Sequence, residues 1–266
     1  MKVGFYQFDV IAKDKEKNLA KVKAELQSKE YDLIVLPELF TSGYLFKNKD
    51  EVESFAEYIP DGETIQVLEN ITNENNCYII GTIPEIENDI IYNTAIVVGP
   101  NGYMGKQRKL HLSKLEQQFF TPGNKIRTFD LNGTRIGIVT CFDSWYPEVA
   151  RMLCSNGAQI LCQPANFGGD MTLNIMRTRA IENLVYTITA NRIGEEKSGD
   201  ITATFRGESQ IVDPRGNILA KTDNSENTTI IEIDAELAKQ KDTEMCNFND
   251  EWQKYSIKSD NTFSIG

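Results

Sequence analysis

The stretch Arg135–Ser155 reads RIGIVTCFDSWYPEVARMLCS and joins an apolar run to an amphipathic run through a cysteine. The first six residues have the composition of a buried strand, and Glu148–Ser155 has the spacing of a helix. Cys141 therefore stands at a strand-to-helix turn, where a nucleophile is exposed at a sheet edge and backbone N–H groups can face an oxyanion. The helix N-terminus should also lower the pKa of its thiol. Alone, however, a cysteine after a strand is more often an inert core residue.

The same alternation of apolar runs and helical segments continues along the chain in both directions. Asp32–Leu36 (DLIVL) has the character of a strand buried on both faces, and Asp14 is a suitable N-cap for the preceding helix. We therefore predict an α/β (α+β) fold in one domain, residues 1–266. The last two expected strands flank the Asp213–Gly216 turn like a hairpin. The strands expected are Val3–Phe8, Asp32–Leu36, Cys77–Thr82, Ile91–Val98, Arg135–Thr140, Gln159–Pro164, Val185–Ala190, Glu208–Asp213 and Thr228–Ile233, and the helices are Asp14–Lys29, Thr64–Asn73, Glu148–Ser155 and Thr172–Leu184.

Composition excludes several classes of function. The net charge of −11 would repel phosphate backbones, so nucleic acid is not expected as a partner. No run approaches the roughly 18 apolar residues of a membrane span, and the N-terminus does not resemble a signal peptide. The five cysteines are odd in number and scattered, which indicates neither a disulfide framework nor a zinc site. We expect a reducing compartment, the cytoplasm, and no metal.

Two further residues could take part in chemistry with Cys141. Glu38 follows the buried strand DLIVL through a proline, at the crevice where α/β proteins bind ligands. Lys109 lies in a cluster of cations, for which a solvated basic loop is the simpler explanation. The single histidine, His111, lies between two leucines and is more consistent with a structural role. Without a histidine base, a nucleophile here needs a carboxylate or a lysine.

These signals occur together in an order that resembles the nitrilase superfamily, the thiol carbon–nitrogen hydrolases. Each block alone would be weak, but the six occur in the order typical of that family, and the similarity runs from Met1 to about Ile233. The blocks are Leu36–Phe40, Arg108–Leu112, Phe120–Gly123, Thr140–Glu148, Arg177–Asn183 and Ala190–Gly194.

The resemblance implies a role for each matching residue. Cys141 corresponds to the nucleophile, Glu38 to the general base and Lys109 to the cation that stabilises the oxyanion. Glu116 corresponds to a second glutamate that positions substrate and the lysine. The family fold is a four-layer α-β-β-α sandwich, assembled as a homodimer or higher homo-oligomer, in which residues 239–266 would be a C-terminal extension at a subunit interface. The chemistry requires no cofactor.

Residues around the cysteine suggest the branch of the family. Cys141–Phe142–Asp143 has the amidase-like form rather than the Cys-Trp-Glu of true nitrilases. Ser144–Trp145 stands where omega-amidase-like members carry an arginine that binds a substrate carboxylate. Tyr44, Phe142 and Trp145 suggest a compact, partly apolar slot, although Trp145 in the core is an equal alternative. Asn166 follows a strand end and is a candidate for binding substrate or for forming a turn.

We therefore expect a hydrolase of a small amide or N-carbamoyl compound that acts through a cysteine thioester and releases ammonia or an amine. A nitrilase or omega-amidase of the same superfamily is the first alternative. A catalytically silent scaffold is a second, although it would not need to keep Cys141, Glu38 and Lys109. A nucleotide-binding domain is disfavoured, because no phosphate-binding glycine motif follows any expected strand.

Overall fold

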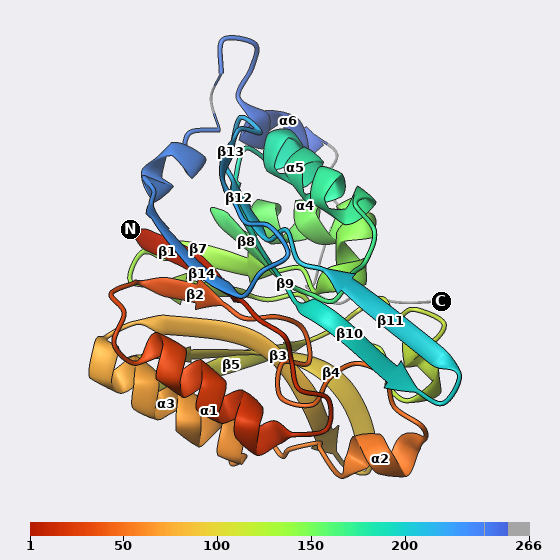
Figure 1. Cartoon of the computed structure of the whole chain (residues 1–266). Coiled ribbons are helices and arrows are strands. Elements are labelled where there is room, and N and C mark those ends of the chain that lie inside the picture. The colour runs from red at the N-terminus through yellow and green to blue at the C-terminus, as the bar shows by residue number, and fades with distance from the viewer. Residues whose placement is uncertain (242, 255–266) are drawn as a thin grey trace.

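Two six-stranded sheets form the centre of the computed structural model, which describes residues 1–241 and 243–254 (Figure 1). The first sheet has the order β14-β1-β2-β3-β4-β5, and its strands β1, β2 and β3 are parallel. The second has the order β13-β12-β9-β8-β7-β6, and β7, β8 and β9 are parallel. The bounds are β1 Lys2–Gln7, β2 Leu33–Val35, β3 Tyr78–Glu87, β4 Ile90–Gly99, β5 Gly102–Arg108, β6 Thr128–Leu131, β7 Thr134–Ile138, β8 Ile160–Ala165, β9 Tyr186–Asn191, β12 Gln210–Val212, β13 Ile218–Lys221 and β14 Asn227–Glu232.

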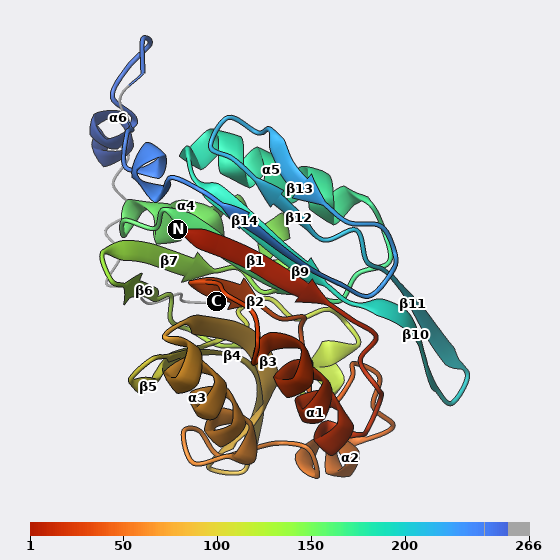
Figure 2. The ribbon, with the colours of Figure 1, turned by 60° about the vertical axis from the view of Figure 1, so that its left-hand side comes forward.

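Helices cover the outer face of each sheet, which gives four layers (Figures 1 and 2). The helices α1 (Lys15–Leu26) and α3 (Glu63–Asn75) lie on the first sheet, and α4 (Pro147–Ser155) and α5 (Met171–Asn183) lie on the second. The inner faces of the two sheets share one apolar core, in which Val3, Phe5 and Val35 pack with residues such as Ile138 and Ile160. The predicted four-layer α-β-β-α sandwich is confirmed.

Local sequence explains most of these elements. In β1 the side chains alternate, so Phe5 faces the core between the sheets and Tyr6 packs under the helices. In α1 the buried positions Leu19, Val22 and Leu26 recur at helical spacing. The Asp14 side chain accepts a hydrogen bond from the Lys17 backbone N–H at 3.1 Å, as expected of an N-cap.

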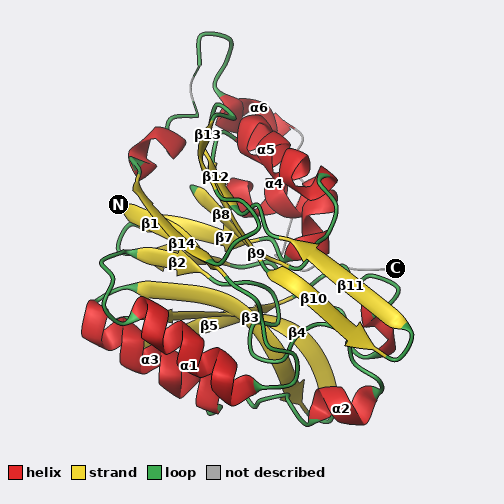
Figure 3. Cartoon of the chain, in the orientation of Figure 1, coloured by secondary structure: helices red, strands yellow, loops and turns green. Residues whose placement is uncertain are grey.

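Four parts of the β structure differ from expectation, and one of them is β6, because no strand was predicted at Thr128–Leu131. Lys106 and Arg108, for which a solvated basic loop was the simpler explanation, lie in strand β5. The predicted hairpin is wrong, because β12 pairs with β13 across the turn, whereas β14 pairs with β1 in the other sheet. An unexpected hairpin of β10 (Ile193–Ser198) and β11 (Ile201–Arg206) extends from one side (Figure 3). Its exposed polar residues lack the apolar alternation by which a strand is usually found.

The remaining elements are short or lie near the C-terminus. They are α2 (Lys49–Glu53), α6 (Phe248–Lys254) and the 3₁₀ turns η1 (Glu116–Gln118), η2 (Cys141–Trp145) and η3 (Ala235–Ala238). Lys241 lies at the start of the expected extension, and its Nζ donates to the backbone carbonyls of Asn183 and Leu184 at the end of α5. Residues 242 and 255–266 of that extension lie outside the described residues. In the described part, no helix is long and apolar enough to cross a membrane.

Candidate active site

Cys141 begins a strained turn between β7 and α4. Its backbone φ of +41° falls in the left-handed region, which costs energy for a residue with a side chain and marks functional turns. Two hydrogen bonds hold the turn, because Ser144 Oγ and Gln163 Nε2 donate to the Cys141 carbonyl at 2.7 and 3.3 Å. These contacts fix the cysteine at the carboxyl end of β7, where the sequence places it.

Glu38 is fully buried beyond the end of β2. The next residue, Leu39, has a φ of +48°, and its backbone N–H donates to Thr82 Oγ1 at 2.7 Å. Asn166 Nδ2 donates to the Glu38 backbone carbonyl at 2.8 Å, while Asn93 Nδ2 donates to its Oε1 at 2.8 Å. The carboxylate is therefore fixed at both its backbone and its side chain.

Lys109 is buried directly after β5 and contacts two carboxylates. Its Nζ lies 2.7 Å from Glu38 Oε1 and 2.6 Å from Glu116 Oε1. Its backbone N–H donates to the Asn93 carbonyl at 2.8 Å, and Glu116 Oε2 accepts from the Ser113 N–H at 3.0 Å. The expectation of a solvated loop is wrong for Lys109. Lys106 and Arg108 instead pair with Glu85 and Glu87 on the outer side of β5.

The topology explains why these residues meet. Glu38, Lys109 and Cys141 each follow the carboxyl end of a strand, and β5 runs in the same direction as β2 because two antiparallel pairings separate β3 from β5. The carboxyl ends of parallel strands form the ligand-binding edge of α/β sheets. Packing the two sheets face to face brings the edge of β2 and β5 against the edge of β7.

Burial and mutual charge determine the protonation of the site. Burial raises the pKa of Glu38 to about 7, with Lys109 opposing and Glu116 adding to the rise. Burial opposes the charge of Lys109, but the two carboxylates overcome this effect and hold its pKa well above the usual range. Burial, and then the Glu38 charge, raises the pKa of the Cys141 thiol well above its usual range. The expected lowering of that pKa is wrong, because the burial of the thiol outweighs any lowering of its pKa by the helix N-terminus.

A cavity of about 340 Å³ opens over Cys141, and it lies within the size range of small-molecule sites. Tyr44, Phe142 and Trp145 line it as expected, and Trp145 is 42% exposed rather than part of the core. Asn166 is not among the lining residues; its amide group supports Glu38 instead. The lining residues are Tyr44, Lys109, Ser113, Glu116, Cys141, Phe142, Trp145, Phe167, Gly169, Asp170, Met171 and Thr172.

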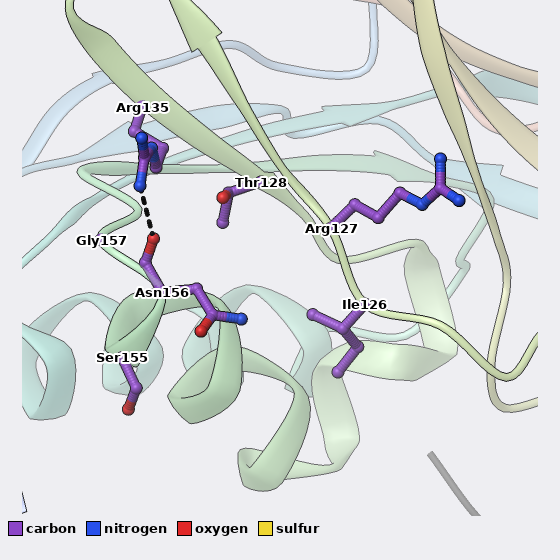
Figure 4. Close-up of a pocket in the computed structure, with 7 residues that line it drawn as sticks. All are labelled: Ile126, Arg127, Thr128, Arg135, Ser155, Asn156 and Gly157. Carbon is purple, nitrogen blue, oxygen red and sulfur yellow. Dashed lines mark hydrogen bonds between the residues drawn. The ribbon is translucent and has the colours of Figure 1, made fainter. Parts of the chain in front are cut away.

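A larger, more open depression of about 640 Å³ lies elsewhere, between β6, β7 and the end of α4 (Figure 4). The Arg135 guanidinium donates to the Asn156 carbonyl at 3.2 Å, whereas the Arg127 side chain extends away from Arg135. The two cations therefore do not converge on a ligand. The chemistry of the lining residues, rather than size, identifies the cavity over Cys141 as the candidate site.

Several supporting residues were missed by sequence reasoning. Asn93 bridges the two carboxylates, with Nδ2 2.8 Å from Glu38 Oε1 and 3.3 Å from Glu116 Oε1. Asp143 accepts from the His111 backbone N–H at 2.7 Å and lies 3.0 Å from its Nδ1, so it joins the lysine segment to the cysteine turn. His111 also stacks on Tyr146, with ring centroids 3.6 Å apart. These contacts agree with a structural role for the histidine.

The wall of the cavity at Tyr44 is anchored by a buried ion pair. Glu196 of β10 accepts from the backbone N–H groups of Tyr44 and Leu45, each at 2.9 Å. Its charge is balanced by Arg192, whose Nη1 lies 2.7 Å from Glu196 Oε2, and by Lys13 at 3.3 Å. No local pattern could indicate the contact between Tyr44 and Glu196, because the two residues lie 152 positions apart along the chain.

Comparison with known proteins identifies the family. The family model described as carbon-nitrogen hydrolase matches residues 2–242. The chain belongs to the carbon–nitrogen hydrolase family. A protein named nitrilase from Pyrococcus abyssi is 37% identical to this hydrolase over 265 residues, which cover 97% of this chain and 100% of the relative. An omega-amidase from Homo sapiens is 33% identical over 219 residues, or 76% of each chain.

Solved structures agree with this assignment. A carbon–nitrogen hydrolase from Helicobacter pylori matches with a TM-score of 0.83 at 26% identity, covering 90% of this chain and 91% of that one. A member of the nitrilase superfamily from Saccharomyces cerevisiae matches with a TM-score of 0.79 at 27% identity, covering 98% and 96%. The family and reaction class predicted from sequence are thus confirmed: the protein is an enzyme that hydrolyses carbon–nitrogen bonds.

Proposed function

We propose that this hydrolase cleaves a small amide or N-carbamoyl compound through a thioester on Cys141. The observation that carries the proposal is the buried Lys109 ammonium, 2.7 Å from Glu38 and 2.6 Å from Glu116, beside a cysteine in a cavity of substrate size. A silent binding scaffold would gain nothing from this arrangement, because taking three charged groups out of water is costly unless they act together.

The first step is removal of the thiol proton by Glu38. The raised pKa of the Cys141 thiol keeps it neutral at rest, so a base must act during attack. A carboxylate with a pKa of about 7 is suited to accept a proton at neutral pH and return it later. Glu38 is thus the general base, and its proton passes next to the departing nitrogen.

The second step is attack of sulfur on the carbonyl carbon, which places negative charge on oxygen. Lys109 Nζ and the Phe142 backbone N–H at the start of η2 are the donors for this oxyanion. Glu116 orients the lysine through its 2.6 Å contact. After ammonia or an amine departs, Glu38 activates water, which hydrolyses the thioester and restores the thiol.

The proposal is tested by trapping the acyl enzyme. Ammonia release from a panel of small amides and carbamoyl compounds should disappear in Cys141→Ala, with the fold retained by circular dichroism. Hydroxylamine should divert the acyl group to a hydroxamate in the wild-type protein only. Full activity in Cys141→Ala would exclude the thioester mechanism, and hydrolysis without any hydroxamate would argue for direct attack by water.

Nitrile hydrolysis is a second candidate, favoured by the nitrilase name of the Pyrococcus abyssi relative. Attack of the same thiolate on a nitrile gives a thioimidate rather than a tetrahedral oxyanion, so the oxyanion donors would contribute less to that first step. We therefore expect a higher kcat/KM for an amide than for the corresponding nitrile, measured on matched pairs in the same ammonia assay.

We also propose that the chain is one domain that works as a homodimer or higher homo-oligomer in the cytoplasm. All five cysteines are free, which supports a reducing compartment. The apolar residues Ile181, Ile218 and Leu219, which are 44–47% exposed, support burial against a second copy. Light scattering after size-exclusion chromatography tests the assembly, and a mass of one chain would reject it.

A further inference from the structure

The charge around the cavity is unbalanced at its outer end. Inside, the lining cation Lys109 is shared between Glu38 and Glu116. At the exposed rim stands Asp170, immediately before α5. Its side chain makes no capping hydrogen bond to the helix. Among the residues that the structure describes, it also has no ion-pair partner. An uncompensated carboxylate therefore faces the cavity mouth.

Aromatic side chains stand in the same wall. Trp145 lines the cavity with 42% of its surface exposed, and its Nε1 lies 3.4 Å from Thr172 Oγ1 on α5. Phe142 lies beside it, with ring centroids 6.1 Å apart. The face of an indole attracts cations, and the attraction is larger for partly desolvated groups.

We propose that Asp170 and Trp145 recognise a cationic group, such as an ammonium, at the end of the substrate distant from the scissile bond. The inference rests on the proposed amide hydrolysis and names its substrate class. A carboxylate at that end would meet Asp170 with no arginine among the lining residues to compensate it. The net charge of −11 adds a general repulsion of anions.

The cavity limits the size of such a substrate. Its volume of about 340 Å³ lies near the lower end of the range for small-molecule sites. A linear amide with a four-carbon spacer and a terminal charged group, of about eight to ten heavy atoms, suits a site of this size. Such a molecule is therefore small enough for the cavity over Cys141, which Asp170 also lines.

Three amides with the same four-methylene spacer test the proposal: 5-aminopentanamide, hexanamide and adipamic acid, which end in an ammonium, a methyl group and a carboxylate. Their dissociation constants are measured by ligand-observed NMR against the Cys141→Ala protein, which separates recognition from turnover. We expect the ammonium compound to bind about threefold to tenfold more tightly than hexanamide, as for an exposed ion pair with a cation–π contact, and adipamic acid to bind most weakly.

Substitution assigns the effect to its source. Asp170→Asn should remove most of the preference while changing the hexanamide affinity less than about twofold, since only a charge is lost. Asp200→Asn, the same change at an exposed position on the turn between β10 and β11, should leave the order of affinities intact. An acidic residue at a helix start also stabilises the helix dipole, but that effect would not distinguish the three ligands.

The results separate the two proposals. If 5-aminopentanamide binds no better than hexanamide, or if Asp170→Asn retains the preference, the inference is overturned even when hexanamide is hydrolysed through Cys141. If wild-type protein hydrolyses none of the amide panel, the proposed function fails while the order of affinities still reports on Asp170. Raising the NaCl concentration to 0.5 M should reduce the preference, and an unchanged preference would also count against the ion pair.

Discussion

The pH dependence of kcat/KM should report the ionisation of Glu38. A base acts in its deprotonated form, so the rate should rise with pH through the pKa of that carboxyl group. Burial raises this pKa to about 7. With one titrating group, about 9% of the enzyme would be active at pH 6 and about 91% at pH 8, a roughly tenfold increase. An exposed glutamate with a pKa of about 4.3 would leave the rate flat over this interval.

Glu116→Gln tests the cause of that pKa. The like charge of Glu116 is one of the causes that raise the pKa of Glu38, and Glu116 also shares Lys109. Removing the charge leaves the lysine to Glu38 alone. Both effects lower the pKa of Glu38, so the acid limb should move to lower pH. Glu16→Gln, at an exposed position in the first turn of α1, should leave the limb in place.

The assay is ammonia release at substrate concentrations well below KM, from pH 5 to 9, with circular dichroism at each pH. A discontinuous colorimetric readout avoids the pH dependence of a coupling enzyme. The pKa of Lys109 is held well above its usual range, so the lysine should not add an alkaline limb below pH 9. A flat profile between pH 6 and 8, or an acid limb that moves to higher pH in Glu116→Gln, would refute the reasoning.

The other predictions concern three further positions. Lys109→Arg should lower kcat about a hundredfold or more, because a planar fork does not replace a compact ammonium, whereas Lys106→Met should stay within a few-fold. Iodoacetamide should label Cys141 more slowly when substrate is present, whereas the partly exposed Cys246 should be labelled at an unchanged rate. Peptide mass spectrometry follows both rates, and equal protection of the two cysteines would point to a change of overall structure. Glu196→Gln should raise KM several-fold more than it lowers kcat. It should also lower the free energy of unfolding by about 3–5 kcal/mol in urea titration, because Arg192 and Lys13 lose a buried partner. A loss confined to kcat would contradict an anchoring role.

The sequence predicted those parts of the fold that local patterns determine. Apolar runs such as those of β2 and β8 are buried on both faces, so their composition alone identifies them. The positions of Glu38 and Cys141 also followed, because each comes just after such a run. Lys109 required the family resemblance, since its neighbouring charges favour a loop when no partner is known.

Strand β5 shows why the charges were misleading. Alternate residues of a strand point to opposite sides. Arg108 therefore reaches the outer carboxylate of Glu85, with Nη2 to Oε1 at 2.6 Å, while Gln107 turns inward and donates to the Ile138 carbonyl at 2.7 Å. Glu85 lies 23 positions from Arg108 along the chain, and Ile138 lies 31 positions from Gln107. No local pattern therefore specifies these partners. The same holds for Asn93, whose two carboxylate partners were found only in the structure.

The buried charges of this site have opposite consequences for stability and for chemistry. Burial alone would favour a neutral Glu38, and an isolated lysine would lose its proton in the same environment. Placing Lys109 between two carboxylates keeps it charged, as its proposed role at the oxyanion requires, while the second carboxylate, Glu116, adds to the rise in the pKa of Glu38, the proposed base. One lysine with one glutamate would make a tighter pair whose carboxylate accepts a proton less readily. The third charge would therefore adjust the proposed base to neutral pH, and the hydrogen bonds that Glu116 accepts from Asn93 Nδ2 and the Ser113 N–H offset part of the cost of burying it.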